Sequence, residues 1–344
     1  MAAPQRNFTL RILLPVLIGL AVVGWLFHDD FNAAVWHSLE FNSRAAIAIA
    51  AAVVFMAGRD FGLAWRFRTI TDRQLSWRRA FRVDLMCAFT SAITPSAVGG
   101  SALAVFYLNR EGVSVGRATT LTLTTLLLDE LFFVVFCPLL FLLLPVDALF
   151  GSGQRDVFLD SVEIAFWLVY SGIVAYTLLL FCGILVWPHK VEWLVNKVFG
   201  WRPLRRWSKG AAETGANIVA TSAWIRRCGR RWWLNVFGAT VVSWFSRYLV
   251  VNALFWGFVP AASGLLVFGR QFVVWVLLMI SPTPGGSGVS EWLFTTYYGD
   301  LIGSAGVALI LAMMWRLLSY YVYLVAGILL LPSYFGKKQK PKNQ

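Results

Sequence analysis

Two proline–glycine breaks interrupt long apolar segments of this chain, and they constrain its fold more than any other feature. The first break is ITPSAVGG at 93–100 and the second is SPTPGGSG at 281–288. In lipid, a broken backbone leaves N–H and C=O groups without water, so it is tolerated only where protein buries it or where it lines a wet cavity. Paired breaks in corresponding positions of two halves are typical of transporters that bind their substrate between the halves.

Composition places the chain in a membrane. Of its 344 residues, 58% are hydrophobic and 14% are charged, whereas soluble domains are about 45–50% apolar and about 25% charged. The fold class predicted is therefore an all-α polytopic membrane bundle. The net charge of +13 comes from basic residues that gather between apolar segments, as topology requires. Without an aromatic stacking module they do not indicate nucleic-acid binding. The scattered cysteines and histidines predict no disulfide framework, metal site or cofactor.

Apolar length predicts about six full spans, because a membrane helix needs about 20 residues. The basic stretches 66–82 and 189–231 and the basic tail 333–344 are typical of cytoplasmic loops, so both termini are expected on the cytoplasmic side of the cell membrane. The predicted spans are 10–27, 45–65, 118–144, 162–187, 232–258 and 302–331.

The segments that flank each break are too short to span. We expect them to form two re-entrant hairpins of half-helices, the first entered from the cytoplasmic side and the second from the outside. For the first segment, a single helix kinked at Pro95 stays open as an alternative. The hairpins and the spans that follow them define two inverted repeats, about 80–145 and 264–332, within one domain over 1–332.

Each break has the chemistry of an anion site. A threonine followed by proline, as in Thr94-Pro95 and Thr283-Pro284, fits a helix N-cap and first helical position. Two such N-termini meeting at mid-depth would hold a phosphate or carboxylate, and the glycines would let a head group approach the backbone. Close helix packing is the alternative role for these glycines. The predicted substrate-binding residues are Thr94, Pro95, Ser96, Gly99, Gly100, Arg247, Thr283, Pro284, Gly285, Gly286, Ser287, Gly288, Glu291 and Arg316.

Charged residues also lie inside the predicted spans, where each costs about 2.5–3.5 kcal/mol on insertion. Asp129 and Glu130 are predicted to form an ion pair or to couple transport: one of them pairs with Arg247 or Arg316, and the other faces a cavity. Either arginine could instead bind a lipid phosphate in bidentate fashion. A buried ion-pair network that only holds the bundle together stays open. Glu291 is a candidate carrier of a coupling proton.

The basic loop 188–231 begins with an amphipathic stretch, 191–207, that mixes tryptophans with lysines and arginines. Such a stretch is expected to lie on the inner leaflet and bind anionic lipids.

The motifs TPSAVGGSALAVFYLNREGVS (94–114) and SPTPGGSGVSEWLF (281–294) resemble the lysylphosphatidylglycerol synthase transmembrane-region family over about 10–332. The resemblance implies a flippase with re-entrant helices that moves anionic or aminoacylated lipids. The residues that match its motifs are Pro95, Gly99, Gly100, Thr283, Pro284, Gly285, Gly286, Gly288 and Glu291.

Two departures from the family matter. This chain has Asp129-Glu130 where the family often has Glu-Arg, so any ion pair there is rearranged. Only a short basic tail follows Pro332, so no soluble aminoacyl-transferase domain and no lipid aminoacylation are expected.

The predicted function is a lipid flippase or transporter rather than an enzyme, with membrane lipids as partners. Two alternatives stay open: a membrane enzyme acting on lipid phosphates, and a scaffold for lipid-modifying enzymes. No nucleophile–base set or phosphate-binding loop supports the first. A homo-oligomer and a lipid-modifying enzyme as partner are both compatible with the sequence.

Overall fold

The protein is a polytopic helical membrane protein. The computed structural model describes residues 41–94, 98–150, 157–201 and 208–335. Five helical stretches in this part of the chain are long and apolar enough to cross a membrane: Ser43–Ile70 (α3), Val115–Leu143 (α6), Asp160–Val186 (most of α8, Val157–Phe181, with a π-helical turn, Cys182–Val186), Arg230–Phe258 (α11) and Ala305–Leu331. The last contains α15 (Ala305–Arg316), a π-helical turn (Leu317–Tyr321) and most of α16 (Val322–Phe335). These coincide with five of the predicted spans, and the sixth, 10–27, lies outside the described residues.

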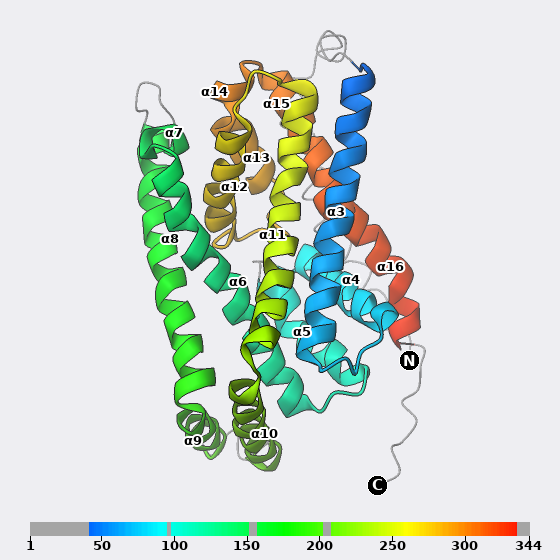
Figure 1. Cartoon of the computed structure of the whole chain (residues 1–344), viewed down its shortest axis with the longest axis vertical. Coiled ribbons are helices and arrows are strands. Elements are labelled where there is room, and N and C mark those ends of the chain that lie inside the picture. Colours follow the sequence, from blue (N-terminus) through cyan, green and yellow to red (C-terminus); the bar gives the residue numbers. More distant parts are fainter. Residues whose placement is uncertain (1–40, 95–97, 151–156, 202–207, 336–344) are drawn as a thin grey trace.

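Helices α3 and α11 pack side by side through the middle of the bundle (Figure 1). Small residues permit the close approach, as is common between membrane helices. A Cβ on Gly62 would lie 2.8 Å from the backbone of Ser243, and one on Gly257 would lie 2.4 Å from the Cβ of Ala48. The pair therefore forms a closely packed axis beside which the two hairpins are placed.

The first break separates α4 (Trp77–Ile93) from α5 (Val98–Arg110), and the two helices pack as a hairpin. A Cβ on Gly100 would lie only 1.9 Å from the hydroxyl of Ser91. Arg82 Nη1, in the first half of α4, lies 3.5 Å from the carboxylate of Glu111, which directly follows α5. The two free ends of this hairpin are therefore at the same end of the bundle. The start of α4 and the end of α5 thus lie together, and that this hairpin is re-entrant in a membrane stays a prediction.

The second break lies between α12 (Gly264–Leu278) and α13 (Val289–Tyr297), which is followed by the short α14 (Gly299–Ile302). Here the predicted helix start is wrong: α13 begins at Val289 with Gly288 as N-cap, and Pro284 is not in its first turn. Residues 283–287 instead form consecutive turns, with φ of +57° at Gly285 and +71° at Gly286. This left-handed backbone cannot join a right-handed helix, and only glycine adopts it without strain.

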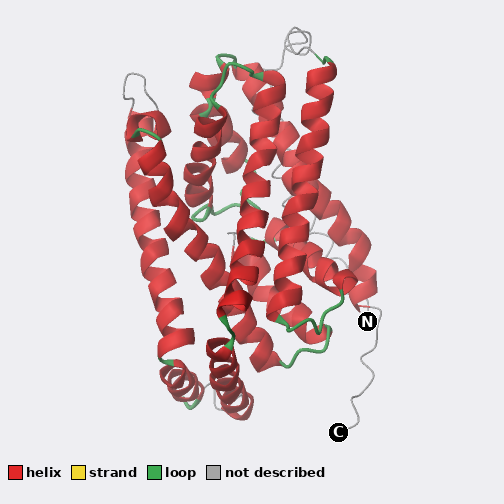
Figure 2. Ribbon diagram, in the orientation of Figure 1, coloured by secondary structure: helices red, strands yellow, loops and turns green. Residues whose placement is uncertain are grey.

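The order of long helix, hairpin and long helix occurs twice, as α3, α4/α5, α6 and as α11, α12/α13, α15/α16. Figures 1 and 2 show the hairpins at opposite ends of the bundle: α4 and α5 occupy its lower half, and α12 and α13 its upper half. The inverted repeat itself, with one hairpin entered from each side of a membrane, stays a prediction.

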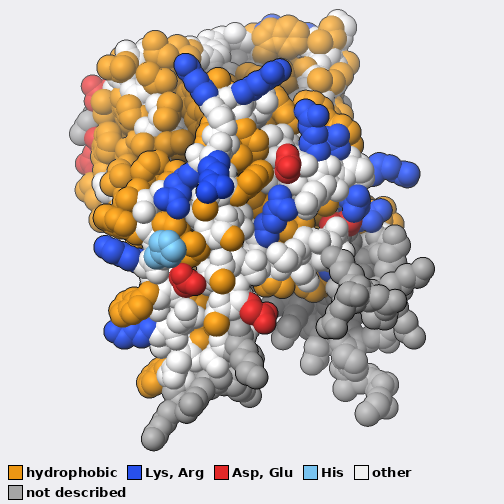
Figure 3. All heavy atoms as spheres, turned by 60° about the horizontal axis from the view of Figure 1, so that its bottom comes forward, with side chains coloured by type: hydrophobic (Ala, Val, Ile, Leu, Met, Phe, Trp, Pro, Cys, Tyr) orange, Lys and Arg blue, Asp and Glu red, His pale blue; other side chains and the backbone are white. Residues whose placement is uncertain are grey.

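At the lower end, α9 (Pro188–Phe199) and α10 (Ser208–Arg227) pack against each other below the spans (Figure 1). Helix α9 contains the beginning of the predicted amphipathic stretch, 191–207. The end of that stretch, 202–207, lies outside the described residues. Its exposed apolar side chains include Trp193 and Leu194, next to Lys190 and Lys197. Lysines and arginines are spread over this end (Figure 3).

Candidate functional site

The two breaks meet in the middle of the molecule. The backbone N–H of Gly285 donates to the carbonyl oxygen of Thr94, 3.2 Å away, and the hydroxyl of Tyr320 donates to the carbonyl oxygen of Ala92 at the same distance. Thr94 is the C-cap of α4, and its hydroxyl donates back to the carbonyl oxygen of Thr90. Two motifs far apart in the sequence are therefore neighbours in space. The predicted residues Pro95 and Ser96 lie outside the described residues.

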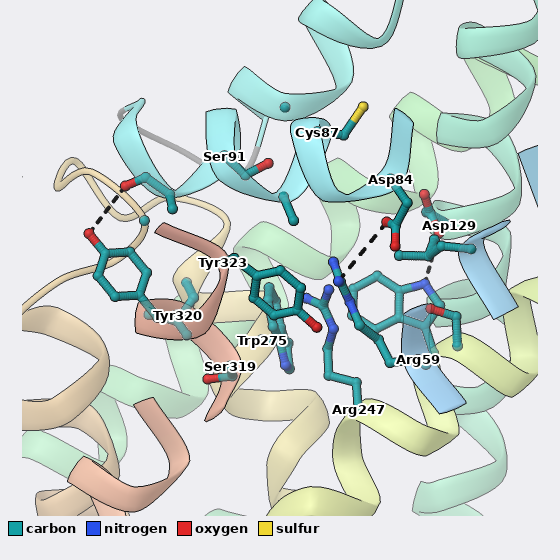
Figure 4. Close-up of a pocket in the computed structure, with 18 of the residues that line it drawn as sticks. Arg59, Asp84, Cys87, Ser91, Asp129, Arg247, Trp275, Ser319, Tyr320 and Tyr323 are labelled. Carbon is teal, nitrogen blue, oxygen red and sulfur yellow. Dashed lines mark hydrogen bonds and ion pairs between the residues drawn. The ribbon is translucent and has the colours of Figure 1, made fainter. Parts of the chain in front are cut away.

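A cavity of about 270 Å³ lies beside this meeting point (Figure 4). Both hairpins, both helices of the central pair, α6 and the α15/α16 span line it. Its volume is near the lower end of small-molecule sites, which have about 300–1,000 Å³. From the predicted set, the lining includes Gly100, Asp129, Glu130, Arg247, Gly285, Gly286 and Arg316.

Arg316 and Glu291 form a buried ion pair, with 2.8 Å between Nε and Oε1. The carboxylate also accepts from the N–H of Gly288 and the hydroxyl of Ser290, both at 2.8 Å. Arg316 in turn donates to the carbonyl oxygen of Gly285 at 3.1 Å. Glu291 is 0% exposed and does not line the cavity. The pair therefore holds the glycine turns in place, and each oxygen of Glu291 has a donor.

The remaining residues of the second motif serve the same turn. The hydroxyls of Ser281 and Thr283 lie 3.1 Å apart, and the N–H of Ser287 donates to the carbonyl oxygen of Pro284 at 3.0 Å. None of these four residues lines the cavity. Of the first motif, Gly99 lies in α5.

The predicted pairing of Asp129 or Glu130 with Arg247 or Arg316 is wrong for the described residues. Oδ1 of Asp129 pairs with Nη1 of Arg66 at 2.5 Å and accepts from the indole N–H of Trp244 at 2.9 Å, so neither Arg247 nor Arg316 is its partner. The sequence had suggested that Arg66 begins a cytoplasmic loop. Helix α3 instead continues to Ile70, and this places Arg66, only 4% exposed, in the interior beside α6 and α11.

Among the described residues, Arg247 is the cation of the cavity that lacks a counter-charge. Within the described chain, no carboxylate lies within ion-pair distance of it. Its guanidinium lies over two indole rings, 4.5 Å from the centroid of Trp275 and 5.0 Å from that of Trp244. Figure 4 shows it reaching toward the same space as Arg59 and Asp84. A guanidinium held by rings alone keeps its fork of N–H donors available for an anion.

Polar atoms without partners gather on the wall of this cavity. Buried nitrogens or oxygens that have no hydrogen-bond partner in the described structure occur on five lining residues: Arg59, Arg66, Asp84, Glu130 and Trp275. Buried polar groups in proteins are ordinarily satisfied by protein or by ordered water. The cavity therefore suits a polar, charged guest with water.

Sequence reasoning missed Arg59, Asp60 and Asp84. Arg59 pairs with Asp60 at 2.5 Å, and the hydroxyl of Tyr323 donates to the same Asp60 oxygen at 2.7 Å. All three charged residues interrupt apolar segments, so the rule that singled out Asp129 applies to them equally. No group of three or more potential metal ligands occurs in the described ranges.

The fold and this polar interior define a multi-pass helical membrane protein with a charged central cavity. The chain belongs to the family described as the lysylphosphatidylglycerol synthase TM region, whose model matches residues 12–327. It is also similar to a UPF0104 membrane protein of Archaeoglobus fulgidus, with 21% identity over 343 residues, 96% of this chain and 99% of that protein. The resemblance inferred from the two motifs is thereby confirmed.

Proposed function

We propose that this protein moves a lipid with an anionic head group between the leaflets of the cytoplasmic membrane. The head group would enter the cavity between the hairpins while the hydrocarbon tails stay in the bilayer. The observation on which the proposal rests is the free guanidinium of Arg247 in a cavity at the meeting point of two broken helices. Family membership fits a lipid-related role.

The electrostatics favour a phosphate over a neutral head group. Among the described residues, Arg247 has ring contacts but no carboxylate partner, and Arg59 has one close carboxylate, Asp60 at 2.5 Å, with Asp84 farther away at 4.0 Å. A phosphate between the two guanidinium groups would accept charge-assisted hydrogen bonds from both. In a low-dielectric interior such contacts replace the hydration that the head group loses on leaving water.

The basic face gives an orientation for the cycle. Positive charge at the ends of α4, α5 and α10 is typical of the cytoplasmic side, so we place these ends there. In this orientation the free ends of the first hairpin face the cytoplasm, and those of the second hairpin face the outside. Loosening one hairpin at a time would then expose the cavity to one leaflet at a time.

Transport of labelled lipid in proteoliposomes tests the proposal. Purified full-length protein is reconstituted with fluorescent phosphatidylglycerol, phosphatidic acid or phosphatidylcholine, and quenching from outside measures the exchange between leaflets. We expect exchange of at least one of the two anionic lipids above the rate in protein-free vesicles. Arg247→Gln should slow it about tenfold or more, because a hydrogen bond to a charged group is worth about 1.5–3 kcal/mol.

Arg44→Gln is the matched control, since Arg44 also lies over a tryptophan ring, Trp256, at 5.0 Å but does not line the cavity. An Arg247→Gln variant as fast as the parent would refute the anion site. Mass spectrometry of the recovered lipid addresses the alternative of an enzyme, because a chemically altered head group would support that reading. A third reading, a scaffold, predicts that the cavity variants have no effect on exchange.

A further inference from the structure

The cavity holds a carboxylate, Asp84, that the proposed anion site does not use. It lies on α4 in the first hairpin, is 1% exposed and lines the cavity (Figure 4). Its Oδ1 is 4.0 Å from Nη1 of Arg59, and its Oδ2 has no hydrogen-bond partner in the described structure. A buried carboxylate costs free energy when it is charged without close donors.

Arg59 does not supply the close donor that Asp84 lacks, because its guanidinium forms a shorter ion pair with a second carboxylate. Asp60 takes the short ion pair at 2.5 Å, and the ring of Tyr323 lies 4.6 Å from the same guanidinium. The hydroxyl of Tyr323 fixes Asp60 in turn. Asp84 is thus the weaker partner of a shared cation.

Three cations around Asp84 nevertheless favour its charged form. The charged and titratable groups that face it are Arg59, Asp60 and Arg66 on α3, Arg247 on α11, Tyr323 on α16 and Cys87 on α4 itself. An anion that binds to the guanidinium groups offsets their positive charge. The arginines then stabilise the charged form of Asp84 less. Binding of the anion and protonation of Asp84 therefore favour each other, and thermodynamic linkage makes the effect reciprocal.

We propose that Asp84 is a proton-binding site, and that it takes up one proton from water when an anionic head group binds in the cavity. The inference rests on the proposed function. The carboxylate gains an O–H bond and loses it again when the head group leaves, so no redox step is involved. A phosphodiester with one negative charge and one proton add no net charge to the cavity, which lowers the cost of the loaded state in a low-dielectric interior.

The other buried carboxylates fit this role less well. Both oxygens of Glu291 have donors, and Arg316 pairs with it at 2.8 Å. Glu130 is only partly buried, whereas Asp84 is 1% exposed, although among the described residues Oε2 of Glu130 also lacks a partner. Glu130 therefore supplies the matched comparison for Asp84.

Calorimetry of lipid binding tests the inference. Short-chain phosphatidylglycerol and phosphatidic acid are titrated into the full-length protein in detergent, in two buffers with different enthalpies of ionisation, which gives the number of protons taken up. The parent should take up about one proton per lipid bound, and its affinity should fall by up to about tenfold per unit of rising pH. Asp84→Asn should bind lipid with almost no proton uptake and a flat pH profile, whereas Glu130→Gln should retain the uptake.

The outcomes separate the two proposals. If neither lipid binds, or if Arg247→Gln binds as tightly as the parent, the anion site fails and the inference fails with it. If lipid binds without proton uptake, the inference alone is overturned. The same holds if Asp84→Asn keeps the uptake or if Glu130→Gln loses it. The proton count of the parent requires no variant, so it can overturn the inference even if Asp84→Asn does not fold, and Glu130→Gln then tests the other unpartnered carboxylate of the cavity.

Discussion

The backbone N–H of Gly285 donates a hydrogen bond to the carbonyl oxygen of Thr94, 3.2 Å away, and so joins the two broken helices of this membrane protein. In lipid these groups have no water to bond. This hydrogen bond therefore satisfies a backbone donor of the second break and a backbone acceptor of the first. The hydroxyl of Tyr320, which donates to the carbonyl oxygen of Ala92, adds a second link. One hairpin cannot move far without breaking these contacts or taking the other hairpin with it.

Gly285→Ala should destabilise the protein. The backbone there has a φ of +57°, and a Cβ would lie 2.3 Å from the ring of Tyr320 and 2.9 Å from the carbonyl oxygen of Ala92. The strained backbone alone costs about 1–3 kcal/mol, and the contacts add to it. Thermal unfolding in detergent measures the loss. Gly172→Ala is the control, because nothing lies within 4 Å of a Cβ at that position. Equal melting temperatures for the two variants would contradict the close meeting of the breaks.

Glu291→Gln should destabilise the second hairpin more than most single substitutions. It leaves the guanidinium of Arg316, 5% exposed, without the carboxylate that lies 2.8 Å away. Breaking a buried pair by removing one partner costs about 3–5 kcal/mol. Thermal unfolding in detergent measures the loss. The control is Glu213→Gln, which changes an exposed carboxylate on α10. A Glu291→Gln protein as stable as this control would show that the pair does not hold the turn.

The spans and the breaks could be predicted because their signals are local. Apolar length identifies a span without knowledge of its neighbours, and proline with glycine interrupts a helix wherever it occurs. The start of α13 could not be predicted in this way. Pro284 follows a threonine, as at many helix starts, but the left-handed φ values at Gly285 and Gly286 delay the helix to Val289.

The partners inside the cavity depend on which helices pack together, and no local signal gives that. Asp129 finds Arg66 because α3 extends past the apparent end of its apolar segment and passes beside α6 and α11. Asp84 is a different case. It lies within the half-helix α4, so the cost of burying a charge could have identified it from the sequence, although it was missed.

Arg66 and Asp129 should be energetically coupled. Their side chains are 2.5 Å apart, and Trp244 donates to the same oxygen of Asp129. In a double-mutant cycle of Arg66→Gln and Asp129→Asn, the unfolding free energies should show an interaction of about 0.5–3 kcal/mol. A second cycle with Glu130→Gln in place of Asp129→Asn should show clearly less, because Glu130 has no ion pair in the described structure. Equal interaction energies in both cycles would argue that adjacency on α6, rather than the ion pair, couples these sites.

The two free ends of the first hairpin should be reachable from one side of the membrane. Arg82 and Glu111 lie 3.5 Å apart, whereas a single helix that crossed here would separate its ends by about 30 Å of hydrocarbon. The four native cysteines are first replaced, and single cysteines are then placed at Arg82, Arg110 and, at the opposite end of the bundle, Asp147. A membrane-impermeant maleimide should label the first two from the same side, which we expect to be the cytoplasmic one, and the third from the other side. If instead Arg82→Cys and Arg110→Cys are labelled from opposite sides, α4 and α5 cross the membrane as one interrupted span. The cavity between two opposed hairpins could then not serve both leaflets.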